Sequence, residues 1–252
     1  MGNVVHVRNL TIGEGLPKIC IPLTDTDLHS LLRSAQTLQN SPYDLVEWRA
    51  DFYGGLQSET GCLETLQELR QVLGEIPLLF TIRTVEEGGQ ADISTKDYEA
   101  VNLAVIQSGL ADLIDVELSK GEDVMRRLCA AAHHSSTAKI VASKHDFAKT
   151  PPESEIVTSL CRMQELGADL AKYAVMPTCE RDVLTLLSAS IIMKEQHCDT
   201  PVITMSMGSL GAVSRVCGAL SGSAVTFGTA GQASAPGQLP ADILKSFLEY
   251  LK

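Results

Sequence analysis

The sequence predicts an α/β protein that folds as a single (β/α)8 barrel of the TIM type. Short apolar runs that suit strands buried on both faces alternate with amphipathic stretches of helical spacing. The alternation repeats eight times over 252 residues, and about 250 residues is the typical length of one such barrel. The composition does not change between the repeats, so we expect one domain over residues 1–252.

Each repeat begins with a candidate strand. The strands are expected at residues 18–23, 45–49, 78–83, 113–118, 139–145, 169–175, 202–205 and 224–227. Apolar residues at helical spacing follow them, around 28–38, 63–69, 95–108, 122–132, 151–163, 180–193, 211–218 and 243–251. Thr24 or Asp25 is the expected N-cap of the first helix. This order of elements is that of a parallel barrel inside a ring of helices.

Residues 1–17 precede the first strand and form an N-terminal extension. Two apolar segments, 4–7 and 10–12, flank Arg8 and Asn9, which predicts a β-hairpin. We place this hairpin across the bottom of the barrel as a plug.

A doubly wound open sheet is the alternative fold for alternating strands and helices. Sheets of that kind that bind dinucleotides carry a GxGxxG turn after the first strand. The first candidate strand here has no such turn behind it, which favours the barrel.

The chain is acidic, with a formal net charge of -11 and a pI near 5.0. Such a field repels nucleic acid and acidic membrane surfaces, so we expect neither as a partner. No run of about 18 apolar residues is present, and the first residues lack the apolar core of a signal peptide. The negative net charge does not exclude a small anionic substrate, because positive side chains in a cleft override it locally.

The seven cysteines are odd in number, and no pair has CxxC spacing. This argues against a disulfide framework and against a structural zinc site. We therefore expect reduced thiols and a cytoplasmic location. No set of His, Cys or carboxylate residues has the spacing of metal ligands, so we expect no metal.

Charged residues stand at alternate positions near the ends of several predicted strands. Alternate strand residues of a barrel face its interior and its helix layer. Val46 and Trp48 suit the helix layer, which turns Glu47 and Arg49 inward. The same pattern turns inward Thr81, Arg83, Asp115, Glu117, Ser143, His145 and Lys172. Because buried charge is costly unless it is paired or used, we expect either an ion-pair network or an active site there.

Lys172 and His145 are the strongest catalytic candidates. A lysine on an apolar strand either reaches out to water or serves as a nucleophile. An apolar interior with arginine neighbours lowers the pKa of a lysine amine and frees its lone pair for a Schiff base. Lys144 is a rival, but its position in the alternation places it on the helix side. An inward His145 would be the acid and base beside that amine.

The segment 227–238 follows the last strand. It is either a flexible loop or an anion-binding loop or lid, since barrels often hold anions after the seventh and eighth strands. Arg215 follows the seventh strand, where its guanidinium could bind a carboxylate through two parallel hydrogen bonds.

These residues stand in motifs of one enzyme family. The motifs are VEWRAD at 46–51, FTIRT at 80–84 with EGG at 87–89, IDVE at 114–117, SKHDF at 143–147, KYAVMP at 172–177, MSM at 205–207 with SR at 214–215, FG at 227–228 and ASAPGQ at 233–238. With them the chain resembles the type I 3-dehydroquinate dehydratases of the shikimate pathway, from Lys18 to the last helix.

The resemblance implies a hydro-lyase that converts 3-dehydroquinate to 3-dehydroshikimate. It implies a homodimer of (β/α)8 barrels that needs no cofactor. By the same resemblance Lys172 forms the Schiff base, His145 is the general acid and base, and Glu87 orients His145.

The resemblance also implies which residues bind the substrate. Glu47, Arg49 and Arg83 match residues that hold its hydroxyl groups, Arg215, Ser234 and Gln238 match those around its carboxylate, and Met205 and Phe227 match apolar walls. One departure is visible at the end of the first strand. Many relatives have a serine where Pro22 stands, and proline brings no hydroxyl for a polar contact.

A Schiff-base aldolase and a barrel that only binds a metabolite are the two alternative functions. A Schiff-base aldolase shares the barrel and the lysine, but it would need a phosphate site and would cleave a carbon–carbon bond. A barrel that only binds a metabolite would have no reason to keep Lys172 and His145 in one cavity.

Overall fold

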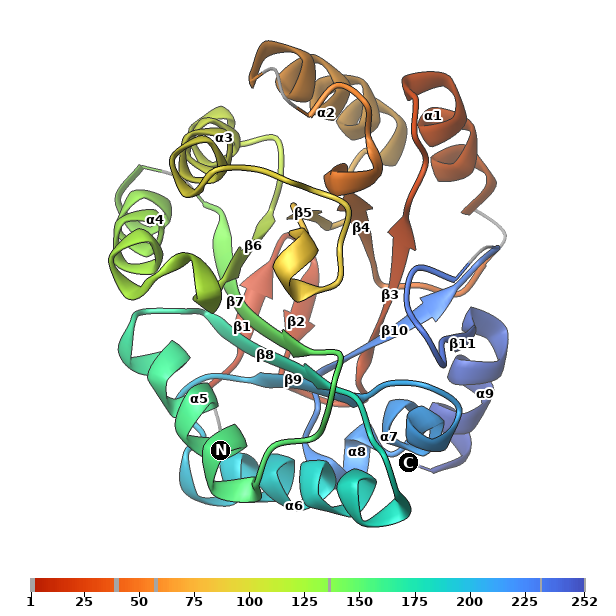
Figure 1. Cartoon of the computed structure of the whole chain (residues 1–252). Coiled ribbons are helices and arrows are strands. Elements are labelled where there is room, and N and C mark those ends of the chain that lie inside the picture. Colours follow the sequence, from red (N-terminus) through yellow and green to blue (C-terminus); the bar gives the residue numbers. More distant parts are fainter. Residues whose placement is uncertain (1–2, 39–40, 57–58, 136, 232, 252) are drawn as a thin grey trace.

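Eight parallel strands form the barrel in the computed structural model, which describes residues 3–38, 41–56, 59–135, 137–231 and 233–251 (Figure 1). The strands are β3 (Lys18–Leu23), β4 (Leu45–Arg49), β5 (Leu78–Thr81), β6 (Leu113–Glu117), β7 (Lys139–Asp146), β8 (Leu170–Val175), β9 (Val202–Ser206) and β10 (Val225–Thr229). They pair in chain order, and β10 returns to pair with β3. Val202 bridges Ser223 and so closes the ring between β9 and β10. The predicted barrel is confirmed.

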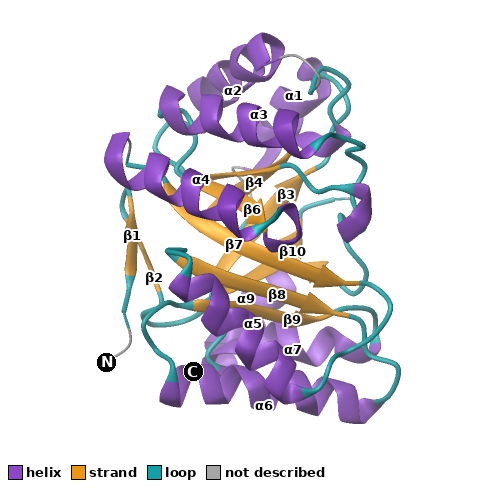
Figure 2. Cartoon of the chain, turned by 60° about the vertical axis from the view of Figure 1, so that its left-hand side comes forward, coloured by secondary structure: helices purple, strands orange, loops and turns teal. Residues whose placement is uncertain are grey.

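An outer layer of helices surrounds the strands (Figures 1 and 2). The helices are α1 (Leu28–Thr37), α2 (Glu59–Leu73), α3 (Thr95–Ser108), α4 (Glu122–Ser135), α5 (Glu153–Glu165), α6 (Glu180–Gln196), α7 (Val213–Val216), α8 (Gly218–Ser221) and α9 (Ala241–Tyr250). Within the described residues, none of these helices is long and apolar enough to cross a membrane.

The N-cap of α1 is Asp27, whereas the sequence predicts Thr24 or Asp25. Asp27 Oδ1 accepts a hydrogen bond from the Ser30 N–H at 2.9 Å, which is the bond that a capping side chain makes. Asp25 accepts from the Ser34 hydroxyl at 2.9 Å instead. That carboxylate is therefore occupied and does not cap the helix.

Element ends also differ from the predicted ones by a residue or two. The strand predicted at 78–83 ends at Thr81, because the chain then leaves the sheet for the 3-10 turn η3 (Val85–Glu87). The helix predicted at 211–218 is three short pieces, since Cys217 leaves helical geometry. A short strand, β11 (Leu239–Pro240), pairs with β10 and is too brief to show an alternation in the sequence.

Two apolar cores stabilise the fold. The larger one lies between strands and helices and includes Trp48, Phe80 and Tyr173. The smaller one fills the lower interior of the barrel and joins residues such as Leu45 to Ile12 of the hairpin. The hairpin strands β1 (Val5–Val7) and β2 (Leu10–Ile12) pair antiparallel and cover that end of the barrel, so the predicted plug is confirmed (Figures 1 and 2).

Aspartates at the starts of strands hold neighbouring strands together. Asp44, Asp112 and Asp169 accept the backbone N–H groups of Ile19, Leu78 and Ile140 at 2.7 to 2.8 Å. Asp112 also accepts from Arg8 of the hairpin at 2.6 Å. One carboxylate therefore ties the plug to two strands of the barrel.

Candidate active site

Polar side chains gather at the carboxyl ends of the strands around a cavity of about 150 Å³. The lining residues are Glu47, Arg49, Arg83, Glu87, Gly88, His145, Phe147, Lys172, Ala174, Met205, Met207, Arg215, Phe227, Ser234, Ala235, Pro236 and Gln238. All eleven residues predicted for the site are among them. The cavity also lies at the end of the barrel where such enzymes hold their substrates.

The alternation predicted along the strands is confirmed. Val46 and Trp48 belong to the outer core, whereas Glu47 and Arg49 line the cavity. Lys144 lies on the helix side as predicted, with its Nζ 5.1 Å from the centre of the Tyr173 ring. The rival lysine is therefore outside the cavity.

Lys172 projects from β8 into the cavity, and 4% of the residue is exposed. Its Nζ lies 3.3 Å from Asp115 Oδ2 and 3.9 Å from Glu47 Oε1. The Phe227 ring centre lies 4.6 Å from the same atom. The sequence predicts arginine neighbours, but the charged groups in contact are carboxylates, because β4 and β6 also turn acidic residues inward.

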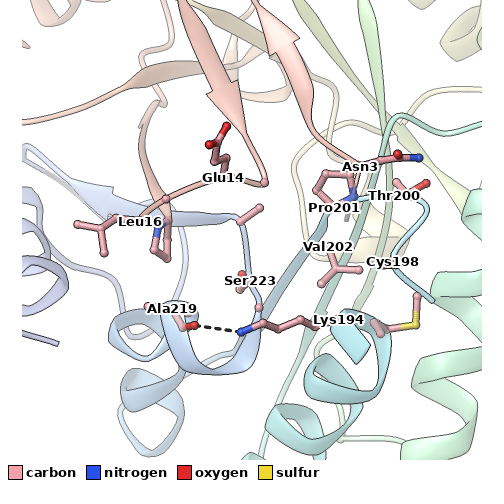
Figure 3. A pocket seen from close by; sticks show the side chains of 17 residues that line it. Asn3, Glu14, Leu16, Lys194, Cys198, Thr200, Pro201, Val202, Ala219 and Ser223 are labelled. Carbon is pink, nitrogen blue, oxygen red and sulfur yellow. Dashed lines mark hydrogen bonds between the residues drawn. The ribbon is translucent and has the colours of Figure 1, made fainter. Parts of the chain in front are cut away.

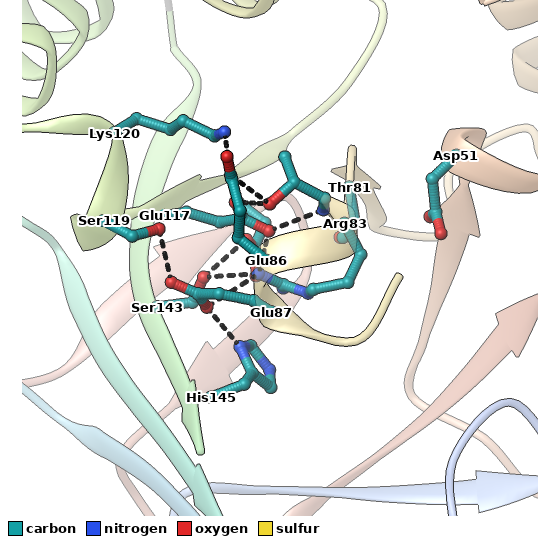
Figure 4. Close-up of polar contacts among 12 residues, drawn as sticks. Asp51, Thr81, Arg83, Glu86, Glu87, Glu117, Ser119, Lys120, Ser143 and His145 are labelled. Atoms are coloured by element: carbon teal, nitrogen blue, oxygen red, sulfur yellow. Dashed lines mark hydrogen bonds and ion pairs between the residues drawn. The ribbon is translucent and has the colours of Figure 1, made fainter. Parts of the chain in front are cut away.

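Arg83 is the hub of a buried ion-pair network (Figure 4). Its guanidinium lies 2.8 Å from both Asp115 and Glu117 and 3.5 Å from Glu87. Glu117 also accepts from the hydroxyl of Thr84 at 2.6 Å. Asp115 and Glu117 are fully buried and do not line the cavity, so the alternative of an ion-pair network holds for these two residues.

The charges of this network decide the protonation of Asp115. Burial acts to raise the pKa of its carboxyl, but Arg83 and Lys172 outweigh burial and hold that pKa below its ordinary value. Asp115 is therefore an anion at neutral pH and accepts a hydrogen bond from the Ser143 hydroxyl at 2.6 Å.

His145 and Glu87 form a pair at the edge of the cavity. His145 Nδ1 lies 2.8 Å from Glu87 Oε2 (Figure 4). Burial, with the positive charges of Arg83, Lys172 and Arg49, holds the pKa of His145 well below its ordinary value. Burial raises the pKa of Glu87 to about 7. His145 is thus a neutral imidazole at pH 7, the state that a general base requires.

Arg49 and Glu47 are each fixed by a neighbour outside the cavity. Arg49 makes a two-pronged contact with Asp51, at 2.7 and 2.8 Å. Glu47 accepts from the Thr81 hydroxyl at 2.8 Å. Asp51 and Thr81 stand in the family motifs, but the sequence alone indicates no role for either of them. Their positions leave the other edges of Arg49 and Glu47 open toward the cavity.

Arg215 lines the same cavity and brings a positive charge to it. It is 2% exposed and donates to the carbonyl oxygens of Phe227 and Pro236, at 3.4 and 3.0 Å. Its buried Nε has no hydrogen-bond partner, and within the described part of the chain no carboxylate pairs with it. Burial lowers its pKa to about 10, so the guanidinium stays charged at neutral pH.

Ser234 and Gln238 stand beside Arg215 in the loop after β10. They bond each other twice, from the Ser234 N–H to Gln238 Oε1 at 2.8 Å and from Gln238 Nε2 to Ser234 Oγ at 2.9 Å. Gln232, in the middle of the predicted anion-binding segment, lies outside the described residues. The described part of that segment therefore faces the cavity with an amide and a hydroxyl.

Several lining residues were not singled out from the sequence. Phe147 and Met207 stand in the motifs but were given no role. Gly88 has a φ of 78°, and a Cβ built there would lie 2.4 Å from the Phe147 ring. Glycine is therefore required where that ring packs over the turn, and this close approach has no signal in the sequence.

A second cavity, of about 210 Å³, lies at the other end of the barrel (Figure 3). It is lined by the loop after the hairpin and by α6 and α8, and Lys194 there donates to the Ala219 carbonyl at 3.3 Å. None of the predicted site residues lines it. Across the described ranges, no cluster of three His, Cys, Asp or Glu residues could hold a metal ion.

The fold and the cavity define a class: a TIM-barrel enzyme with a buried amine, an imidazole–carboxylate pair and a guanidinium that no carboxylate of the described ranges contacts. The family model of type I 3-dehydroquinase matches residues 19–252. The chain belongs to this family, and it is an enzyme with 3-dehydroquinate dehydratase activity, a lyase of the shikimate pathway.

Known relatives and solved structures of this family are similar to the chain over its whole length. A 3-dehydroquinate dehydratase from Clostridioides difficile is 47% identical over 251 residues, which are all of this chain and 98% of the relative. One from Klebsiella pneumoniae is 46% identical and covered completely. The crystal structure of the Clostridium difficile type I enzyme with covalent modified comenic acid matches with a TM-score of 0.96 and 47% identity, over 100% of this chain and 98% of that one. The Geobacillus kaustophilus enzyme matches with a TM-score of 0.95 at 38% identity, with the same coverage.

Proposed function

We propose that this enzyme dehydrates 3-dehydroquinate through a Schiff base on Lys172, with His145 as general acid and base. The observation that carries the proposal is the placement of both residues on one cavity of about 150 Å³, which Arg215 also lines. An amine, a neutral imidazole and an unpaired cation are the groups that a keto acid needs for this reaction. The relative solved with a covalently modified ligand lends support to covalent chemistry in this family.

The first stage makes the substrate acidic. The Lys172 ammonium first releases a proton, and the free amine attacks the ketone carbon. The carbinolamine then takes up a proton and loses water, which leaves an iminium ion. The iminium accepts electron density that a ketone holds poorly, which acidifies the adjacent C–H. Phe227 and Met205 are proposed as the apolar walls of this part of the cavity.

The second stage eliminates water. His145 Nε2 takes the adjacent proton and leaves an enamine. With Glu87 ionised, Nδ1 donates to that carboxylate, so the lone pair of Nε2 stays free for this step. The enamine expels the neighbouring hydroxyl, and protonated His145 returns its proton so that water departs. Hydrolysis of the product iminium then releases 3-dehydroshikimate and the free amine, with a net loss of one water.

The remaining lining residues are proposed to hold the ring. Arg215, Ser234 and Gln238 would bind the carboxylate, and Glu47, Arg49 and Arg83 would bind the hydroxyl groups. The burial of Arg215 without an acidic partner among the described residues supports the first set. A charged guanidinium in a dry site gains most from an anionic ligand. Arg83 keeps Asp115 and Glu117 as partners, so its share in hydroxyl binding is the smallest.

Borohydride trapping tests the covalent step. Reduction during turnover of 3-dehydroquinate should fix substrate mass on Lys172, and Lys172→Ala should abolish both adduct and turnover. Lys144→Ala is the matched control, because that amine points to the helix layer, and it should be labelled like the wild type. His145→Ala should still form an adduct while dehydration falls to near zero.

Peptide mapping decides the assignment. Substrate mass on Lys144, or no mass on any lysine during turnover, contradicts the Schiff base on Lys172. Dehydration by His145→Ala at close to the wild-type rate would show that another group is the base. The homodimer that the family resemblance implies, and the cytoplasmic location expected from the cysteines, stay predictions.

A further inference from the structure

Ser119 forms the outer end of a hydrogen-bonded chain that leads to His145. It lies in the 3-10 turn η4 (Leu118–Lys120), directly after β6. Its hydroxyl donates to Glu87 Oε1 at 2.6 Å, and the other oxygen of Glu87 lies 2.8 Å from His145 Nδ1 (Figure 4). Ser119 itself does not line the cavity. It therefore acts on the reaction only through Glu87.

Glu87 ends the short turn η3, and its backbone N–H donates to the Thr84 carbonyl at 3.0 Å. The turn fixes the backbone of Glu87, whereas side chains of other elements fix its carboxylate. Lys120, the neighbour of Ser119, forms an ion pair with Glu86, the neighbour of Glu87. The turn η4 thus ties down both acidic residues of η3, one by a neutral hydroxyl and one by a charge.

We propose that Ser119 is a positioning residue, which keeps Glu87 ionised and oriented and thereby holds the His145 tautomer that acts as base. This inference rests on the proposed role of His145. An ionised Glu87 accepts the proton of Nδ1 and leaves Nε2 with a lone pair. A protonated Glu87 would donate to Nδ1, which would move the ring proton to Nε2 and remove the base.

The charges around this pair come from three strands, the segment after β5 and two turns. They are Arg49 on β4, Arg83 after β5, Glu86 on η3, Asp115 and Glu117 on β6, Lys120 on η4 and Lys172 on β8. Burial is the largest influence on Glu87 and raises its pKa to about 7, and the Ser119 hydrogen bond is among the contacts that oppose burial. Loss of that bond therefore raises the pKa of Glu87 further.

A higher pKa of Glu87 makes the enzyme lose activity at a higher pH. The active form needs an ionised Glu87, so activity falls as pH drops through its pKa. In Ser119→Ala the acid limb of kcat/KM should move to higher pH by about one unit, the effect of one lost hydrogen bond to a carboxylate. From a pKa of about 7, this lowers kcat/KM about fivefold at pH 7 and leaves it nearly unchanged at pH 9.

Two variants make the test specific. Ser119→Thr keeps the hydroxyl and should keep the wild-type profile. Ser94→Ala is the matched control, because Ser94 also donates to a carboxylate at 2.6 Å, that of Asp97, but caps α3 away from the cavity. It should lower stability and leave the pH profile unchanged. A loss of activity in Ser119→Ala that is equal at pH 7 and pH 9 would overturn the inference.

Nitrogen NMR of the His145 ring gives a readout that needs no turnover. In the wild type at pH 8, the Nδ1–H tautomer should dominate, and in Ser119→Ala the change to the Nε2–H form should begin about one pH unit higher than in the wild type. Identical titrations in both proteins would refute the inference whatever His145 does in catalysis. If instead the titrations differ but His145→Ala still dehydrates, the proposed function fails and the positioning by Ser119 stands.

Discussion

At the scale of single residues, Arg215 is the clearest case of a side chain whose surroundings call for a ligand. The residue is 2% exposed, and among the described residues its Nε has no partner and its other nitrogens donate to the carbonyl oxygens of Phe227 and Pro236. Burying a cation in this way is costly, and burial lowers its pKa to about 10. An anionic substrate group would offset that cost, which is why recognition of the carboxylate should depend on this residue.

Arg215→Ala should raise KM by about 10- to 100-fold with a smaller effect on kcat, because a charge-assisted contact present in both ground and transition states is lost. Steady-state kinetics on 3-dehydroquinate measures both constants. Arg127→Ala removes an exposed guanidinium on α4 and is the control that should leave KM unchanged. A wild-type KM with a collapsed kcat in Arg215→Ala would show that this residue serves the chemical step instead.

Pro22 stands where the family resemblance predicts a serine. It pairs in register with Glu47 on the neighbouring strand and does not line the active-site cavity. The proline brings no hydroxyl to that position, as the sequence indicates. The proposed binding of the substrate hydroxyl groups therefore rests on Glu47, Arg49 and Arg83, with no contribution from Pro22.

At the scale of elements, the hairpin is the part of the fold added to the barrel. Its apolar side chains complete the lower core, and one polar anchor holds its turn. Arg8, at a φ of 51°, places its guanidinium 2.6 Å from Asp112 and 2.8 Å from Glu75. Because Asp112 also binds the backbone of β5, the anchor connects the hairpin to the strand register.

Arg8→Ala should lower the free energy of unfolding by about 1–2 kcal/mol, since hydrogen bonds to a partly exposed but shared carboxylate are lost. Urea unfolding measures the change. Turnover should stay at the wild-type level, because the hairpin lies at the opposite end from the active-site cavity. Arg126→Ala, which breaks an exposed pair within α4, should cost less than about 0.5 kcal/mol. Equal costs for the two variants would refute the anchoring role of Arg8.

At the scale of the whole molecule, the barrel gathers positively charged side chains in one cavity although the net charge of the chain is negative. A chain of net charge -11 brings Arg49, Arg83, Lys172 and Arg215 to one cavity. Closure of the strand ring makes this arrangement, since inward positions from strands far apart in sequence meet across the interior. Carboxylates pair with the first three of these positive side chains, so Arg215 is the cation that the cavity offers to an anionic substrate.

Exhaustive dialysis against EDTA should leave the dehydration rate unchanged. The proposed electrophile is the iminium on Lys172, and the proposed acid and base is His145, so no step calls for a Lewis acid. The rate is measured by the absorbance of the conjugated product before and after dialysis. Loss of activity that one divalent ion restores would contradict the proposal.

Most of the fold and much of the candidate site can be predicted from the sequence, because strands and helices have different periods of apolar residues. A strand buried on both faces has a period of two, so a charged residue at an inward position, such as Lys172, stands out from its neighbours. The apolar stretches between the strands show the helices in the same way. The N-cap of α1 and the break at Cys217 were not predictable, because each depends on contacts made by folded neighbours.

The amino-acid sequence alone predicts the barrel, its hairpin, the inward direction of the polar strand residues and the family. These follow from local periodicity and from motifs that need no knowledge of distance. Only the tertiary structure decided which charges pair: Arg83 with Asp115 and Glu117, Lys172 with carboxylates in place of arginines, and Ser119 with Glu87. Those pairings join strands and turns that are not adjacent in the chain. They depend on the geometry of the closed ring, which periodicity along a single strand does not contain.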